Sequence, residues 1–199
     1  MRARIFRERL SITISMPIIF AFWGNLLAQT PIFSSETITF EVSDTLCVVS
    51  ARYSFQNRSE MRSKSRLFYP VPISDDLPFP NRFQVQSLKS SSTIPFLIHK
   101  EGISFLLEID PFSEEQIYVK YWQVAKGQQF AYILKSTQHW SRALDWAVYE
   151  IRIPNSLELK SCSLDIDSTR VDSNYFIYRI TKQNFMPEKD FEFMWGNQK

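Results

Sequence analysis

The sequence predicts an all-β fold, an antiparallel β-sandwich of roughly ten to twelve short strands. Apolar and polar residues alternate with a period of two almost everywhere after the leader, as in strands that are buried on one face. Turn-forming residues interrupt this alternation at spacings of about ten residues. No stretch carries an amphipathic helical pattern over three turns. Many short strands without helices are typical of sandwiches and barrels.

The first 28 residues have the layout of a secretory signal peptide. Four arginines precede an apolar run from Leu10 to Trp23, and small and apolar residues lead to Ala28, where cleavage is expected. An uncleaved membrane anchor is the alternative, although the run is short and contains Pro17. We therefore expect a periplasmic or secreted mature chain, residues 29–199, with no stable membrane span after cleavage.

Charge and glycine content exclude several classes of function. Residues 1–28 hold four of the 23 Lys and Arg residues and one of the 21 Asp and Glu residues, so the mature net charge is −1. This balance gives no indication of nucleic-acid binding, which depends on clustered positive charge. The four glycines are too far apart for the glycine-rich loops of dinucleotide and NTP sites or for the serine-hydrolase elbow. We expect no cofactor.

The alternation can be followed segment by segment along the mature chain. Each segment is short, as strands usually are. In order, the alternating segments are ETITFEV, CVVSARYSF, RLFYP, RFQVQSL, IPFLI, ISFLLEI, QIYVKYW, FAYIL, AVYEIRI, LKSCSLDI, NYFIYRI and FEFMW. No internal repeat or break in composition separates them, so residues 29–199 are expected to form a single domain.

Turn residues predict how some of these segments are joined. Lys100–Gly102 and Ala125–Gln128 each predict a hairpin in which glycine supplies a positive φ. A two-residue turn in the second hairpin would place Tyr121 opposite Tyr132. Residues 69–81, YPVPISDDLPFPN, hold four prolines and are expected to run over an end of the sandwich or to change sheets.

Two stretches resemble exported β-sandwich domains. Residues 48–72, VVSARYSFQNRSEMRSKSRLFYPVP, have the order strand, Asn-ended turn, strand and Pro-x-Pro. This order resembles the opening of vault/inter-alpha-trypsin-type domains and of related exported bacterial modules. Residues 106–123, LLEIDPFSEEQIYVKYWQ, are similar to the strand, Pro-containing turn and strand of immunoglobulin-like secreted domains. The resemblance implies an immunoglobulin-like β-sandwich with a scaffold or interaction role, and it implies no catalytic residues.

The segment STQHWSRALDW, residues 136–146, has a functional and a structural interpretation. His139 and Asp145 beside Trp140 and Trp146 could form an acid–base pair, or could contact a sugar or a peptide. A catalytic triad would also need a nucleophile and an oxyanion hole, and the nearby serines lie in no recognisable elbow. The favoured interpretation is structural: the segment bridges two strands, its tryptophans cover the end of the core, and Asp145 accepts bonds from turn amides.

The outward residues of segment 117–123 are the strongest candidates for a binding face. Tyr118, Lys120 and Trp122 share one side of this segment. The row would be extended by residues of a later strand if that strand lies alongside, namely Trp146, Glu150 and Arg152. Aromatic side chains on a rigid sheet give a protein partner or a sugar a large contact area at low entropic cost. The alternative is that a second sheet covers this row.

Cysteines and potential metal ligands give weaker signals. Cys47 and Cys162 could pair after export, which would stabilise the chain by about 4 to 5 kcal/mol, or could be buried separately as thiols. No metal site is expected, because His99 lacks a second ligand at zinc spacing. The segment DIDSTRVDSN lacks the glycine and the glutamate of a calcium loop and is expected to be a solvated turn.

These observations predict an exported, non-enzymatic protein that acts through protein–protein contacts in the cell envelope or outside the cell. Its expected partner is an envelope or extracellular protein. The alternative function is that of a carbohydrate-binding module that uses Trp122, Trp140 and Trp146. A hydrolase that uses His139 with Asp145 or Glu150 is the third possibility.

Overall fold

The computed structural model describes residues 30–198, so the predicted leader lies outside the described residues. The described chain is all-β, with fourteen strands in three sheets and one short 3-10 helix, η1 (Lys135–Trp140). The all-β part of the predicted fold class is therefore confirmed. The strand count exceeds the prediction because very short edge strands leave no alternation to detect. Within residues 30–198, no helix has the length and apolarity to cross a membrane.

The largest sheet has eight strands in the order β12-β13-β10-β1-β2-β8-β4-β5. Their bounds are Ser168–Val171 (β12), Tyr175–Phe185 (β13), Leu144–Pro154 (β10), Ile32–Val42 (β1), Leu46–Asn57 (β2), Ser113–Val124 (β8), Arg82–Ser87 (β4) and Ser92–Thr93 (β5). β1 and β10 pair in parallel, so the prediction of purely antiparallel pairing is wrong there. A parallel pair needs a long connection, and residues 43–143 provide it.

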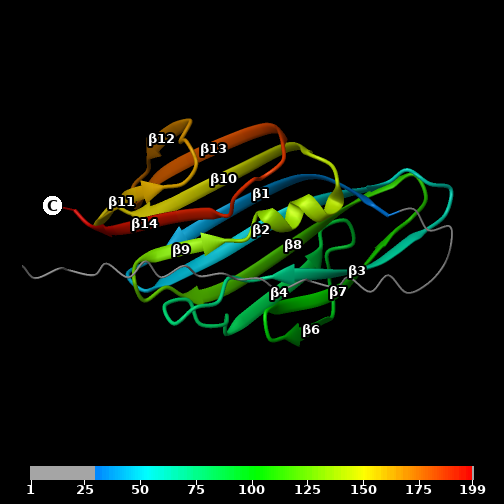
Figure 1. Ribbon diagram of the computed structural model, residues 1–199, viewed down its shortest axis with the longest axis horizontal. Helices are drawn as coiled ribbons and strands as arrows, with labels where there is room; N and C mark the ends of the chain where they lie inside the picture. The colour runs from blue at the N-terminus through cyan, green and yellow to red at the C-terminus, as the bar shows by residue number, and fades with distance from the viewer. Residues whose placement is uncertain (1–29, 199) are drawn as a thin grey trace, which may run out of the picture.

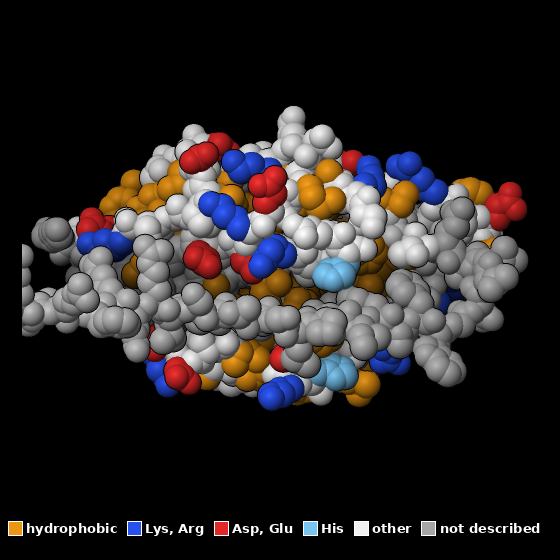
Figure 2. All heavy atoms as spheres, in the orientation of Figure 1, with side chains coloured by type: hydrophobic (Ala, Val, Ile, Leu, Met, Phe, Trp, Pro, Cys, Tyr) orange, Lys and Arg blue, Asp and Glu red, His pale blue; other side chains and the backbone are white. Residues whose placement is uncertain are grey.

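Two three-stranded sheets lie side by side on one face of the large sheet (Figure 1). One has the order β11-β14-β9 and the other the order β3-β7-β6. Their bounds are Leu157–Cys162 (β11), Phe191–Asn197 (β14), Gln129–Tyr132 (β9), Ser63–Pro70 (β3), Gly102–Ile109 (β7) and Phe96–His99 (β6). On the face toward the viewer in Figure 2, acidic and basic side chains are interspersed and hydrophobic side chains show between them.

The core lies between these two layers, as the alternation predicts. In β2 the odd-numbered residues from Cys47 to Phe55 are buried, while the even-numbered residues face the other side of the sheet. Cys162 lies half-buried at the end of β11, and both thiols are free. Of the two alternatives, the structure has the unpaired thiols, with Cys47 packed as a small apolar side chain inside the large sheet.

Three buried tyrosine hydroxyls join the three sheets. Tyr53 comes from the large sheet, Tyr69 from β3 and Tyr132 from β9. The Tyr53 hydroxyl donates to Tyr69 at 3.0 Å, the hydroxyls of Tyr69 and Tyr132 are 2.9 Å apart, and Tyr53 also bonds Tyr132. Burial raises the pKa of each phenol well above its usual range, so all three remain protonated. This cluster satisfies polar groups where the layers meet and fixes their relative positions.

The two predicted hairpins have different outcomes. β6 and β7 form the first, with Gly102 at a φ of +157° directly after the turn. The second is wrong: β8 pairs with β2 and β4, whereas β9 pairs with β14, so Ala125–Gln128 connects two sheets. In this turn Gln128, not glycine, has the positive φ. Tyr121 therefore lies opposite Val49 and Phe83, and Tyr132 lies opposite Phe191.

The proline-rich segment 71–81 changes sheets, as expected, and leads from β3 to β4. Gln123 holds it in place from the core face of β8. Its fully buried side-chain amide donates to the carbonyl oxygens of Pro72 at 2.6 Å and Pro78 at 3.1 Å. These bonds satisfy carbonyl groups of a segment that cannot join a β-ladder.

Candidate functional site

The candidate site is the face of the large sheet that points away from the two smaller sheets, here called the outer face. Tyr118, Lys120 and Trp122 on β8 lie on it, as predicted, because their neighbours Val119 and Tyr121 are fully buried on the core side. All three predicted side chains are partly exposed. No second sheet covers this row within residues 30–198, because both smaller sheets pack on the opposite face of the large sheet.

The neighbouring strands surround this row with hydrogen-bonding and basic side chains. Lys120 lies opposite Ser50 on β2 and Gln84 on β4. Tyr118 lies opposite Arg52, and its hydroxyl donates to the hydroxyl of Ser50 at 3.3 Å. β8 is paired with β2 on one side and β4 on the other, and β2 is also paired with β1, so this part of the face is rigid. Arg52 is a residue of this face that was not predicted as a site residue, although the alternation of CVVSARYSF places it here.

Trp122 is in contact with two cations. The guanidinium carbon of Arg82, its cross-strand neighbour, is 4.6 Å from the centre of the indole ring, and the ammonium nitrogen of Lys120 is 5.0 Å from it. Both distances are typical of cation–π contacts. The contacts fix the orientation of the ring and bring two positive charges together on it.

Three basic side chains of this part of the outer face, Arg52, Arg82 and Lys120, form no ion pair within residues 30–198. Further along the sheet, Glu150 is mostly buried and bonds Arg152 at 2.7 Å, with the guanidinium of Arg170 at 3.7 Å. The carboxylate of Glu150 is therefore neutralised locally by two arginines. Exposed carboxylates of the outer face include Glu41 on β1, which lies in the same cross-strand row as Trp122, and Glu114 at the start of β8.

Trp146, Glu150 and Arg152 also lie on the outer face, three strands away from β8. β10 reaches β8 through β1 and β2, which corresponds to about 14 Å between the strands. Trp146 is 43% exposed, the most exposed aromatic side chain of this face. The predicted extension of the row is thus present, but a gap filled by Thr39 and Ser50 separates its two aromatic ends.

His139 and Trp140 do not belong to this face, because they lie on η1. The Trp140 ring packs on Phe33 and Phe55 with centroid distances of 5.6 and 5.5 Å, so it covers the end of the core as the structural interpretation predicts. His139 Nδ1 lies 3.1 Å from the carbonyl oxygen of Ser136. Residues that are close in sequence therefore lie in different places: Trp140 covers the end of the core, whereas Trp146 lies on the outer face.

The carboxylates proposed as partners of His139 are engaged with arginines. Asp145 accepts from Arg142 at 2.5 Å and not from the turn amides that the structural interpretation expected. Trp146 points to the outer face and does not cover the core, which corrects the second half of that interpretation.

The prediction of a solvated turn for residues 165–174 is wrong in part, because Ser168–Val171 form the edge strand β12, and Asp172 stabilises the turn that follows it. Asp172 accepts from the backbone amides of Asn174 and Tyr175 at 2.9 and 2.8 Å, which lowers the pKa of its carboxyl group, and Asp167 accepts from Thr181. Within residues 30–198, no group of three His, Cys, Asp or Glu side chains is placed to hold a metal ion.

The sequence matches no protein-family model and no curated protein. Similarity to solved structures is found at the level of the fold. A Legionella pneumophila protein proposed to bind a nutrient has a TM-score of 0.66 at 14% identity, over 83% of this chain and 67% of that one. A two-domain M1 zinc metallopeptidase bound to L-arginine has a TM-score of 0.52 at 8% identity, over 83% of this chain and 42% of the peptidase.

These likenesses extend to the arrangement of strands only. The chain spans less than half of the M1 peptidase. Neither the vault/inter-alpha-trypsin-like nor the immunoglobulin-like resemblance finds support, because no family model matches and one sheet has eight strands with a parallel pair.

Proposed function

We propose that the chain is an exported, non-enzymatic β-sandwich module that binds an envelope or extracellular protein through the outer face of its large sheet. The observation that carries this proposal is the open, rigid row of Tyr118, Lys120 and Trp122, with two cations in contact with the ring of Trp122. Trp, Tyr and Arg are the residue types that dominate the energy of protein interfaces. A rigid sheet presents them without the entropic cost of ordering a loop.

The charge of the outer face indicates the chemistry of the partner. Arg52, Arg82 and Lys120 lie on adjacent strands and form no ion pairs within residues 30–198. A partner surface with Asp or Glu side chains would complement these charges and would speed association. The net charge of −1 expected for the mature chain does not oppose this, because recognition depends on the local potential.

Replacement of Trp122 by Ala is expected to weaken partner binding by roughly 30-fold, or about 2 kcal/mol. Lys120→Glu should weaken it by a similar factor because it places a negative charge opposite the acidic partner. The partner is first captured in the native host by a photo-crosslinker placed at Gln84, which lies beside Lys120 on the outer face. Affinities of the purified full chain and its variants for that partner are then measured by titration.

Two controls test whether the outer face is responsible. Lys126→Glu makes the same charge change in an exposed turn and should leave the affinity unchanged. A crosslinker at Glu158 on β11, in the other layer, should give no adduct with the partner. If Trp122→Ala and Lys120→Glu bind as well as the wild type, the outer face is not the interface.

Carbohydrate binding is the second candidate, and Trp146 is the observation that favours it. This side chain is 43% exposed, whereas Trp122 is covered by cations and Trp140 packs on the core. A glycan stacked on the outer face should therefore change the tryptophan fluorescence of the wild type and of Trp122→Ala, but not that of Trp146→Ala. A titration without response across common glycans would exclude this candidate.

A further inference from the structure

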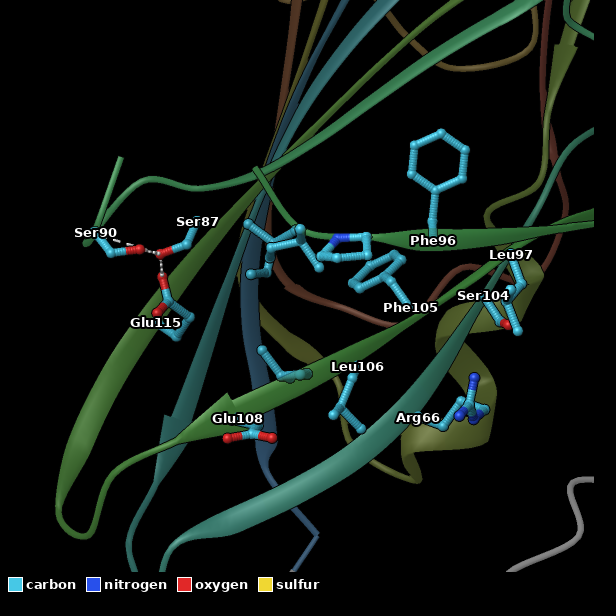
Figure 3. A pocket seen from close by; sticks show the side chains of 14 residues that line it. Arg66, Ser87, Ser90, Phe96, Leu97, Ser104, Phe105, Leu106, Glu108 and Glu115 are labelled. Carbon is cyan, nitrogen blue, oxygen red and sulfur yellow. Dashed lines mark hydrogen bonds between the residues drawn. The ribbon is translucent and has the colours of Figure 1, made fainter. Parts of the chain in front are cut away.

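A hollow of about 530 Å³ lies along residues 104–108 of β7, where β6 stops short (Figure 3). We call it the β7 notch. Consecutive residues of a strand point to opposite faces of a sheet. Because five consecutive residues of β7 line the hollow, it follows the edge of this strand and does not lie over one face. A space of this shape beside a strand matches the place of a missing neighbouring strand.

The main-chain groups of Leu106 and Glu108 face into the notch. The N–H of Val71 donates to the carbonyl of Glu101 at 3.0 Å, so these two residues form a hydrogen-bonded pair. Hydrogen-bonded and non-hydrogen-bonded pairs alternate along an antiparallel ladder. The odd-numbered residues of β7 therefore direct their N–H and C=O groups toward β3. The even-numbered residues face the opposite edge, where β6 pairs with β7 only as far as Phe105. Among the described residues, no strand pairs with the remainder of this edge.

The notch is open because the chain before β6 turns to the other layer. The N–H of Ile94 donates to the carbonyl of Val85 in the large sheet at 2.8 Å. Phe96, two residues later, already pairs with β7. Pro95 between them has no N–H to donate, so it cannot continue the ladder beside Leu106. Pro95 therefore leaves the edge of β7 beyond Phe105 without a neighbouring strand.

The interior of the notch combines an apolar wall with one carboxylate. Phe105, Leu107 and Ile117 provide buried apolar surface. Glu115 of β8 lies at one end, where its carboxylate accepts from the hydroxyl of Ser87 at 3.0 Å (Figure 3). None of the ion pairs within residues 30–198 includes Glu115. This end of the notch is complementary to a cation.

Glu108, the second carboxylate that lines the notch, is not free to bind a cation of a ligand. Glu108 is paired with Lys64 at 2.8 Å, and this contact lowers the pKa of its carboxyl group. At the β6 end, Leu97 and Ile98 are 58% and 66% exposed. The notch thus offers exposed apolar surface, an apolar hollow and the unpaired carboxylate of Glu115. Arg66 of β3, opposite Leu106, also lines the hollow (Figure 3).

We propose that the β7 notch binds an extended peptide segment of a partner protein as an added β-strand. The peptide main chain bonds to Leu106 and Glu108, and an apolar side chain enters the hollow against Phe105 and Ile117. A Lys or Arg two residues away points to the same side and pairs with Glu115. The volume of the hollow is within the usual range for binding pockets, about 300 to 1,000 Å³. This site is separate from the outer face and does not depend on the proposed function.

The test uses the full chain and a fluorescein-labelled peptide, Thr-Val-Thr-Lys-Thr-Val-Thr, followed by fluorescence anisotropy. We expect binding that Glu115→Gln weakens by about tenfold or more, because the peptide loses its charge partner. The matched control is Glu114→Gln, the same change on the adjacent residue, which faces the other side of β8 and should not alter the affinity. In hydrogen exchange, the peptide should protect the amides of Leu106 and Glu108.

Two altered probes separate an added strand from other modes of binding. A peptide N-methylated at alternate amides loses the donors on one edge, and one of the two such peptides should bind about tenfold more weakly or worse. Hexylammonium should not displace the peptide at comparable concentrations, since it has no main chain. The proposal is overturned if the peptide does not bind at millimolar concentration, or if Glu115→Gln binds it as well as the wild type does. It is also overturned if both N-methylated peptides bind as tightly as the unmodified peptide, or if hexylammonium displaces the peptide at comparable concentrations.

Discussion

Replacement of Glu36 by Gln is expected to remove a loss of stability that the wild type undergoes between pH 5 and pH 8. Glu36 lies on the core face of β1, is 3% exposed, and accepts one bond, from the Tyr149 hydroxyl at 2.5 Å. Burial raises the pKa of its carboxyl group from 4.5 to about 7, and the bond from Tyr149 only partly opposes this rise. The group is therefore protonated in the folded protein at a pH where the unfolded chain is ionised.

The direction of the effect follows from proton binding. Between pH 4.5 and about 7 the folded state binds more protons than the unfolded state, so the free energy of unfolding falls as the pH rises. The stability contributed by the neutral group is complete below pH 4.5 and is lost as the pH passes through about 7. The full loss is about 3 kcal/mol, since one pKa unit corresponds to about 1.4 kcal/mol. A glutamine of the same shape keeps the bond to Tyr149 and has no charge to bury.

Urea unfolding at pH 5, 6, 7 and 8 measures this effect as the difference between variant and wild type. That difference should grow in favour of Glu36→Gln by about 2 to 3 kcal/mol from pH 5 to pH 8. Glu41→Gln makes the same change on the exposed side of β1 and should retain the decline of the wild type. A constant difference between Glu36→Gln and wild type across this range would show that Glu36 is ionised in the folded state.

Much of the fold follows from local alternation. The period of two identifies the strands and assigns faces, which is why Tyr118, Lys120 and Trp122 point outward as predicted. The same rule places Glu36 inward, because it precedes Ile38 and Phe40 at intervals of two. The position of this buried carboxylate therefore follows from the alternation, although glutamate is seldom fully buried.

The arrangement of the strands depends on long-range contacts that local patterns do not encode. Ala125–Gln128 looks like a hairpin turn, yet β9 pairs with β14 because both strands bury aromatic side chains against Phe40 of the large sheet. The parallel pairing of β1 and β10 likewise has no local signal. The cations around Trp122 come from two strands, and the β7 notch exists because two sheets diverge at Pro95. Strand order must be known before either site can be assembled.

Replacement of Gly102 by Ala is expected to destabilise the protein by roughly 2 to 4 kcal/mol. Gly102 has a φ of +157°, and an added Cβ atom would lie 2.1 Å from the carbonyl oxygen of Tyr69 and 3.0 Å from the Cα atom of Pro70. Both obstacles are backbone atoms of β3, which is paired with β7 and cannot yield without breaking the ladder. Tyr69 also joins the three sheets through its hydroxyl, so a displacement of β3 reaches the centre of the core.

Gly127→Ala provides the matched control. A Cβ atom there would come no closer than 3.4 Å to the flexible side chain of Gln129, and Gly127 does not have a positive φ. The control should therefore unfold within about 0.5 kcal/mol of the wild type, whereas Gly102→Ala should melt roughly 6 to 12 °C lower. Equal melting temperatures for the two variants would mean that β3 moves away from the added Cβ atom at Tyr69 with no loss of unfolding free energy. In that case the contact between β3 and β7 would not hold the smaller sheet in place.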